Sequence, residues 1–166
     1  MSDAKVGDEF VTHEYDEAIA IQRSIVDAEQ SLSTKHPVAS AKRELKSALA
    51  DDRAFLEQLE KLGKPHGATG KVEDVAEGLT ELMTETLETA VTEGADSDFY
   101  EAHAVLVSLK RKQADGAGGM LAIARDRDDT ELRKASQAMQ RAQISSSNTL
   151  SEELAMYAVK IASAAS

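Results

Sequence analysis

The chain has 166 residues, a length that suits one domain with a sizeable core. Its formal net charge of −11 repels nucleic-acid phosphates, and the absence of cysteine excludes disulfides, thiolate metal sites and thiol catalysis. Only 2 prolines interrupt a sequence that favours helix by its alanine, glutamate, leucine and lysine content, so we expect an all-α fold.

We expect the protein to be cytoplasmic and to bind neither nucleic acid nor membranes. No apolar run approaches the roughly 18 residues of a membrane span, and the polar N-terminal residues do not resemble a signal peptide. The amphipathic helices carry polar faces that are too acidic for anionic lipid.

Helical periodicity begins near residue 13, so we expect residues 1–12 to form a loose arm and residues 13–166 a single helical domain. The first helix is predicted over 13–33, with an inward stripe of Tyr15, Ala18, Gln22, Ile25, Glu29 and Leu32. A short turn leads to a second helix that starts at Pro37 and ends at Gly63. Its inward stripe is Val38, Ala41, Leu45, Ala48, Asp52, Phe55, Leu59 and Leu62.

Residues 64–70 form the one clear loop, and three further helices follow, over 72–93, from Ser97 onward, and over 129–162. The buried face of the third helix is predicted as Val72, Val75, Leu79, Leu82 and Met83. The stripe of the fourth is Phe99, Ala102, Leu106, Leu109, Gln113, Gly116, Met120 and Ile123. That of the last is Leu132, Ala135, Met139, Ala142, Ser146, Leu150, Leu154 and Tyr157. The glycines at 116, 118 and 119 weaken a helix, and close approach of a neighbouring helix is the simplest compensation.

Two helical hairpins joined by a crossover segment correspond to the ferritin-like plan. The stretches Tyr15–Ala18, Glu44–Lys46 and Leu59–Pro65 resemble the YciF-type branch of the ferritin-like superfamily, and Asp74–Leu79 resembles its crossover helix. The resemblance implies a four-helix bundle with a crossover helix, five helices in all, that assembles as a homo-oligomer, most simply a dimer. Active members hold two iron or manganese ions with a glutamate from each of two helices and Glu-x-x-His from each of the others.

The chain lacks that ligand pattern, because none of its 4 histidines stands three residues after a glutamate. Asp52 and Phe55 occupy the expected acid and histidine positions of the second helix, and Leu106 and Leu109 replace the glutamates of the fourth. The resemblance therefore implies a bundle that has lost its metal ligands. Asp52 and Glu29 are the remaining metal-ligand candidates, and we assign no catalytic or cofactor-binding residue.

Counting from a turn near residue 35 places Glu29 and Asp52 about 16 Å apart along the bundle axis. We therefore predict that they cannot share an ion, that Ala18 is level with Asp52, and that Glu29 reaches water near a bundle end. A buried Asp52 needs a partner or it protonates, and Arg23, Arg53 or another chain are the candidates. We expect the glutamines of the stripes, Gln22 and Gln113, to hydrogen-bond across helices.

The sequence has no Gly-x-Ser-x-Gly elbow and no phosphate-binding loop, which favours a protein that is not an enzyme. Our first hypothesis is a non-enzymatic bundle with a role in stress that acts through self-association or partner binding. One alternative is an iron or manganese carboxylate protein, an oxidase or a metal store, with a degenerate site. Another is an apolar-ligand pocket lined by Phe55, Leu106 and Leu109.

Overall fold

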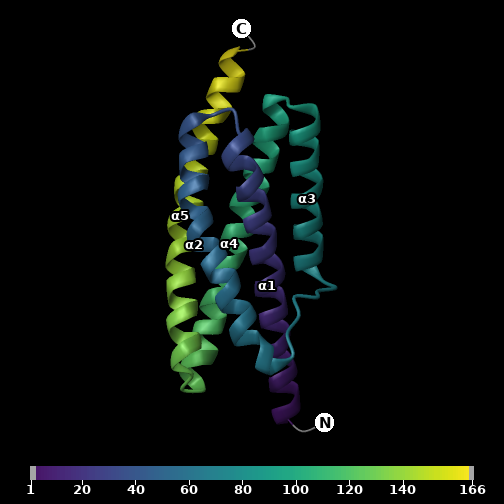
Figure 1. Cartoon of the computed structure of the whole chain (residues 1–166), viewed down its shortest axis with the longest axis vertical. Coiled ribbons are helices and arrows are strands. Elements are labelled where there is room, and N and C mark those ends of the chain that lie inside the picture. The colour runs from purple at the N-terminus through teal and green to yellow at the C-terminus, as the bar shows by residue number, and fades with distance from the viewer. Residues whose placement is uncertain (1–2, 165–166) are drawn as a thin grey trace.

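The computed structural model describes residues 3–164, and nearly all of them are helical (Figure 1). The helices within this range are α1 Asp3–Lys35, α2 Ala39–Gly63, the short 3-10 helix η1 Lys64–His66, α3 Val75–Glu93, α4 Asp96–Asp126 and α5 Thr130–Ala164. The described range contains no strand, so the predicted all-α fold with five α-helices is confirmed. None of these helices is apolar over a length that would cross a membrane.

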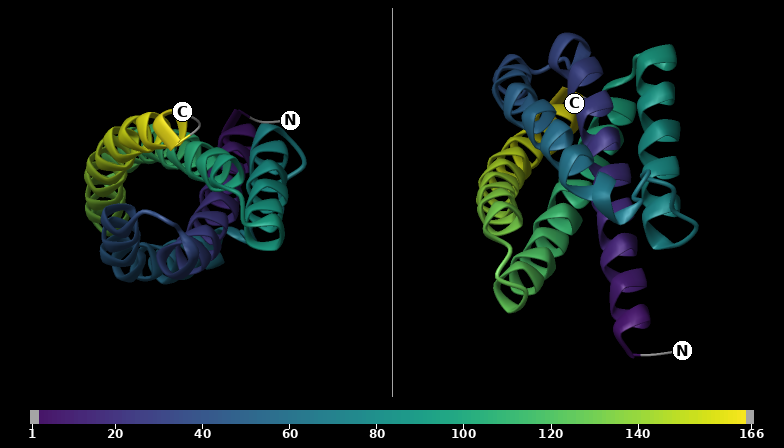
Figure 2. Two further views of the ribbon diagram at one scale, coloured as in Figure 1. Left: turned by 90° about the horizontal axis from the view of Figure 1, so that it is seen from above. Right: turned by 60° about the horizontal axis from the view of Figure 1, so that its bottom comes forward.

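Helices α1, α2, α4 and α5 pack together, and α3 lies outside them against α1 and α4 (Figure 1; Figure 2). α1 and α2 form one antiparallel hairpin, and α4 and α5 form the other. α2 and α4 run in the same direction, so the chain returns through α3 between the two hairpins. The first turns of α1 and the last turns of α5 extend past their neighbours at opposite ends of the molecule.

α1 begins earlier than the sequence pattern indicates. We expected residues 1–12 to form a loose arm; residues 1 and 2 lie outside the described range, but the helix already includes Asp3. Val11 is only 5% exposed and packs in the core, and Arg127 of the α4–α5 turn lies 3.3 Å from the carboxylate of Asp8. These contacts favour continuation of the helix toward the N-terminus.

The predicted inward stripe of the first helix is confirmed, since all six of its residues are buried in α1. The predicted face of the third helix is wrong in part, because Val75 is 70% and Leu82 45% exposed. Met83 is buried as predicted, and the other buried residues of α3 are Ala76 and Ala90. A helix that covers a bundle from outside buries only a narrow face, and small residues allow that face to lie close to α1 and α4.

The apolar core has two parts, which we call the upper and lower core after their positions in Figure 1. The upper core includes Ile25, Leu32, Leu45, Leu106, Leu109, Leu150 and Tyr157. The lower core includes Tyr15, Ala18, Leu59, Ala117, Met120, Leu132 and Met139. On each of the four bundle helices the residues between these two sets include buried polar side chains, among them Gln22, Asp52, Lys110 and Gln143.

The glycines of α4 have less contact with neighbouring helices than we expected. A Cβ added at Gly118 would lie 2.8 Å from the side-chain nitrogen of Gln140, but one added at Gly116 or Gly119 would meet nothing within 4 Å. Close helix approach therefore does not explain Gly116 or Gly119. Each lowers the helix propensity of α4 without a packing benefit.

We expect Gly116→Ala and Gly119→Ala each to raise the free energy of unfolding by about 0.5–1 kcal/mol, because alanine lowers the entropy of the unfolded chain. Urea unfolding followed by circular dichroism measures this. Gly70→Ala is the matched control, and it should lower the free energy of unfolding. Its φ is +81°, and a Cβ there would lie 2.5 Å from Arg23 Nη1. A lower free energy of unfolding in either α4 variant would contradict the conclusion that Gly116 and Gly119 have no packing role.

Candidate functional site

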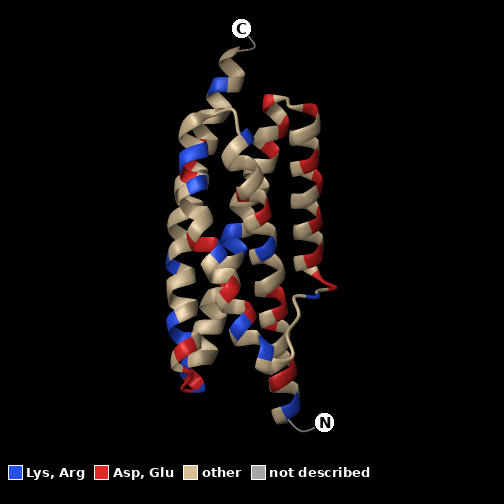
Figure 3. Ribbon diagram, viewed as in Figure 1, with Lys and Arg blue, Asp and Glu red and all other residues tan. Residues whose placement is uncertain are grey.

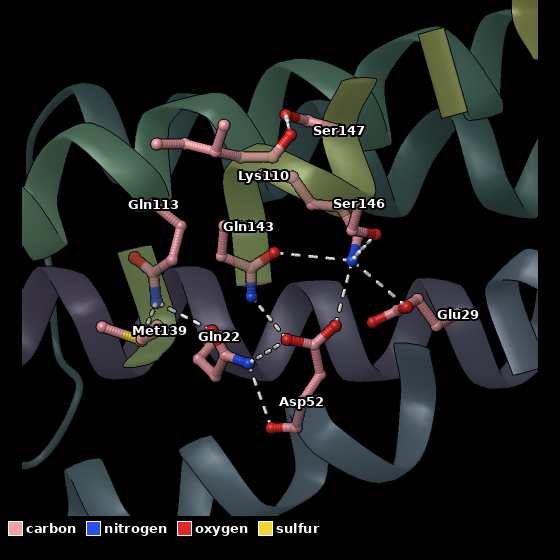
Figure 4. Close-up of polar contacts among 10 residues, drawn as sticks. Gln22, Glu29, Asp52, Lys110, Gln113, Met139, Gln143, Ser146 and Ser147 are labelled. Carbon is pink, nitrogen blue, oxygen red and sulfur yellow. Dashed lines mark hydrogen bonds and ion pairs between the residues drawn. The ribbon is translucent and has the colours of Figure 1, made fainter. Parts of the chain in front are cut away.

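A fully buried lysine lies in the middle of the bundle (Figure 4). The Nζ atom of Lys110 on α4 is 3.0 Å from Asp52 Oδ2 on α2 and 3.3 Å from Glu29 Oε2 on α1. It also donates a hydrogen bond of 2.8 Å to Ser146 Oγ on α5. α1, α2 and α5 thus each place a polar group beside the ammonium that α4 supplies. We call the buried set the polar layer: Gln22, Glu29, Asp52, Lys110, Gln113, Gln143 and Ser146.

Three glutamines complete the polar layer, and two of them, Gln22 and Gln143, hold the Asp52 carboxylate in place. Gln22 Nε2 donates to Asp52 Oδ1 at 2.9 Å and to the Asp52 carbonyl at 3.0 Å. Gln143 Nε2 donates to the same Oδ1 atom, and its Oε1 accepts from Lys110 at 3.4 Å. Gln113 donates to Gln22 Oε1 at 2.9 Å. The prediction that Gln22 and Gln113 hydrogen-bond across helices is confirmed.

The charges within the polar layer balance. Burial, together with a hydrogen bond to Asp52, raises the pKa of Glu29 to about 10 against the opposing charge of Lys110. Burial acts to raise the pKa of Asp52 as well, but hydrogen bonds from Glu29 and Lys110 and the ammonium charge outweigh it, so this pKa is lowered. Neither oxygen of Glu29 has a hydrogen-bond partner among the described residues, although Oε2 lies 3.3 Å from Lys110 Nζ. The layer therefore contains one cation, Lys110, one anion, Asp52, and one neutral acid, Glu29.

The structure brings Glu29 and Asp52 together, so the prediction that they are too far apart to share an ion is wrong. Glu29 does not reach water either, because its exposure is 0%. The α1–α2 turn is centred two residues later than we assumed, which makes Gln22 and not Ala18 level with Asp52. Side chains also lean toward the N-terminus of their own helix, so the two carboxyl groups of this antiparallel pair converge. The long Lys110 side chain spans the remaining distance.

Sequence reasoning missed Lys110 as the partner of Asp52. We named Arg23 and Arg53, but Arg23 forms an ion pair with Glu60 and Arg53 is exposed. Lys110 stands in a short basic run that indicates a solvated helix face. Its spacing carried a usable signal, since it lies one residue after the stripe member Leu109 and three before the stripe member Gln113.

The polar layer does not fit a dinuclear iron or manganese centre. Such a centre needs about four carboxylates with histidine, whereas this layer offers Glu29 and Asp52 alone. Both of them face the Lys110 ammonium, whose positive charge lies where a metal ion would have to bind. A divalent ion at this position would be repelled by the ammonium and would displace the hydrogen bonds that neutralise it.

The residues we expected to line an apolar pocket do not meet. Leu106 and Leu109 belong to the upper core, while Phe55 packs against the lower core beside a space of about 10 Å³, too small for an organic ligand. A surface depression of about 210 Å³ lies between α2 and α5 and reaches the polar layer at Asp52 and Ser146. Asp52 is nevertheless only 3% exposed, and Lys110 is fully enclosed.

Two histidines form a second buried polar pair at the top of the bundle. The backbone N–H of Val38 donates to His36 Nδ1 at 3.0 Å, so the proton of this ring is on Nε2. His36 Nε2 then donates to His103 Nδ1 at 3.0 Å, and His103 Nε2 donates to the Leu150 carbonyl at 2.7 Å. All three of these hydrogen bonds form when both rings are neutral. Burial lowers the pKa of His36 to about 4, and His103 contributes to the shift.

We expect the neutral histidine pair to make the free energy of unfolding decrease at acidic pH. The unfolded chain protonates His36 below about pH 6.5, whereas the folded chain resists protonation down to about pH 4. The stabilisation is therefore complete above pH 6.5, and about 3 kcal/mol is lost as the pH falls through this window. Urea unfolding between pH 7 and pH 4 should show a smaller loss in H36Q. The exposed-histidine variant H66Q should keep the wild-type dependence, and an unchanged slope in H36Q would contradict the assignment.

We expect Glu29→Gln to stabilise the protein at neutral and alkaline pH. The unfolded chain releases the Glu29 proton above about pH 4.5, but the folded chain keeps it, so the wild type loses stability as the pH rises. The glutamine amide reproduces the neutral, hydrogen-bonding form and removes this loss, a gain of roughly 1–3 kcal/mol at pH 7.

The comparison variant for Glu29→Gln is Lys110→Met, which leaves the Asp52 charge buried without a counter-ion and should cost about 3 kcal/mol. Urea unfolding at pH 5 and pH 8 measures both changes. An E29Q protein that loses stability at pH 8 relative to the wild type would show that Glu29 is ionised.

Neither of two comparisons with known proteins assigns the chain to a family. No protein-family model matches it, and no curated protein is significantly similar to it. The likeness to the YciF-type branch accordingly rests on the short stretches of sequence quoted above. What the chain does is therefore inferred from its own side chains and their geometry.

Proposed function

We propose that the chain is a non-enzymatic, ferritin-like bundle that acts through self-association, as a homodimer. The observation that carries this proposal is the Lys110 ammonium between Glu29 and Asp52. Ferritin-like carboxylate proteins build their metal sites in the bundle core from inward side chains of facing helices. In this chain the same region is a hydrogen-bonded layer whose central ammonium is fully enclosed, so we place the function on the surface.

The order and direction of the helices support the ferritin-like part of the proposal. Ferritin-like bundles contain two hairpins joined by one long crossover connection. Here α2 and α4 run in the same direction, and α3 with its preceding segment returns the chain along the outside of the bundle (Figure 1). We place this bundle in the cytoplasm, in keeping with its cysteine-free sequence, and its resemblance to the YciF-type branch links it to stress.

The C-terminal part of α5 is the surface that best supports self-association. Met156 and Val159 stand three residues apart on this helix and are 59% and 66% exposed. Residues at that spacing share one helix face. In a twofold dimer the same face of both chains meets, so one apolar patch is enough to form the contact. The outer helix α3 is a poorer candidate, because it carries five glutamates and no lysine or arginine (Figure 3).

We expect sedimentation equilibrium to show a dimer for the wild type at micromolar concentration and a monomer for the double variant M156E/V159E. The new carboxylates would repel each other and would lose solvation across the contact. V75E is the matched control, because Val75 is equally exposed apolar surface but lies on α3. It should remain dimeric. A wild type that stays monomeric at about 100 µM, well above ordinary oligomer dissociation constants, would contradict the proposal.

A second measurement tests the loss of the interior metal centre. Protein purified without chelators and loaded with iron should not retain the two ions per chain that a dinuclear centre holds. Its oxidase activity with ferrous iron should not exceed that of a Lys110→Met variant. Two tightly held iron ions per chain would overturn the non-enzymatic assignment.

A further inference from the structure

A histidine and two carboxylates from distant parts of the sequence meet on the surface near the lower core. His13 and Glu17 lie one turn apart on α1, and Asp74 ends the segment that leads into α3. His13 Nε2 lies 3.0 Å from Asp74 Oδ2 and 3.9 Å from Glu17 Oε2. These three donor atoms all lie within 4.8 Å of one another. No residue of this cluster belongs to the polar layer.

Each carboxylate is oriented by a contact that uses its other oxygen. Asp74 Oδ1 accepts a hydrogen bond of 3.0 Å from the backbone N–H of Ala76, as the N-cap of α3. Glu17 Oε1 forms an ion pair with Lys112 of α4. The remaining oxygens, Asp74 Oδ2 and Glu17 Oε2, both face His13. Contacts of this kind hold ligands in position around a metal ion in proteins.

The surroundings of the three donors are electronegative and open. Two further carboxylates lie nearby, since Glu14 interacts electrostatically with Glu17 and Asp74, and Glu73 lines the adjoining surface. A depression of about 310 Å³ lies at the same place, lined by His13, Lys71, Val72, Glu73 and Asp74. Water therefore has access to complete the coordination of a bound cation.

We propose that His13, Glu17 and Asp74 form a mononuclear binding site for a divalent cation of the zinc type. Zinc takes imidazole nitrogen and carboxylate oxygen at about 2.0–2.2 Å in a tetrahedral arrangement, with water in a fourth position. Two donors on such an ion lie about 3.4 Å apart. The separations of 3.0 Å and 3.9 Å at His13 bracket this value, so small side-chain rotations complete the geometry.

A cation at this site would fasten the segment before α3 to α1. Asp74 is the first anchor of α3, and residues 67–74 otherwise have little regular structure. Near the start of that segment, Asp16 of α1 accepts hydrogen bonds from the backbone N–H groups of Thr69 and Gly70 at 2.7 and 2.9 Å. The proposed site would fix the other end of the same segment, and with it the start of the outer helix.

Isothermal titration of the full-length protein with zinc chloride tests the site. We expect one ion per chain, and an affinity that falls at least tenfold in each of H13Q, E17Q and D74N. D74N is informative because asparagine still caps α3 but no longer supplies a charged ligand. At a hundredfold excess over Kd, zinc should raise the Tm of the wild type by about 5 °C or more, and it should not raise that of H13Q.

Two control variants make the outcome decisive. H66Q removes another exposed histidine from the same end of the molecule, and E29Q alters the polar layer, so both should bind zinc as the wild type does. An unchanged affinity in H13Q and D74N would overturn the assignment, as would a wild type with no zinc binding tighter than about 1 mM, the range of weak surface contacts. Loss of zinc binding in E29Q would place the ion in the bundle interior and would also overturn it.

Discussion

The buried contact of one ammonium with two carboxyl groups is the constraint on which the rest of this structure depends. Removing a charge from water is expensive, and the low dielectric of the interior repays the cost only when every donor and acceptor is matched. Lys110 contacts one polar group from each of the other three bundle helices, and only the Glu29 carboxyl group among them lacks a hydrogen bond within the described residues. The position of each helix along the bundle axis is therefore fixed by the same ammonium.

A purely apolar bundle tolerates small sliding of one helix past another, because leucine and alanine contacts are interchangeable. The polar layer removes that freedom. A shift of one turn would move Asp52 or Gln143 about 5 Å away from its partner and leave it unpaired in an apolar environment. The layer thus contributes specificity of register, a role best attested for buried polar groups in coiled coils.

Much of the fold follows from hydrophobic periodicity. The stripe from Tyr15 to Leu32 is buried because its spacing of three and four residues matches the helical period. Asp52 was placed on an inward stripe for the same reason, and it is buried. The face of α3 was harder to predict, because an outer helix buries so little surface that Val75 and Leu82 remain exposed without loss of packing.

The candidate site depended on details that a helical pattern does not contain. An error of two residues in the centre of the α1–α2 turn changed which residue of α1 is level with Asp52. The direction in which side chains lean then decided whether Glu29 and Asp52 meet. Lys110 was not recognised as a core residue from the sequence, because a lysine beside Arg111 and Lys112 is typical of a solvated helix face. The structure shows that it is buried.

The histidines of this chain show how environment decides the chemistry of one side chain. His36 and His103 share a hydrogen-bonded chain in which neither ring can accept a further proton without losing a contact, so burial keeps the pair neutral. His13 has the opposite surroundings, with solvent on one side and carboxylates on the other. His13 Nε2 lies at the surface beside the carboxylates of Asp74 and Glu17, whereas the ring nitrogens of the buried pair all form hydrogen bonds inside the bundle.

The separation of the apolar interior into the upper and the lower core has a consequence for local unfolding of the molecule. Hydrophobic contacts do not continue from one part to the other, so cooperativity between them passes through the polar layer and the backbones of the helices. Fluctuations that release the lower part, around η1 and the segment that follows it, can end at Asp52 and Lys110. Local unfolding of one part then need not include the other, so the two parts can differ in the rate at which their amide hydrogens exchange.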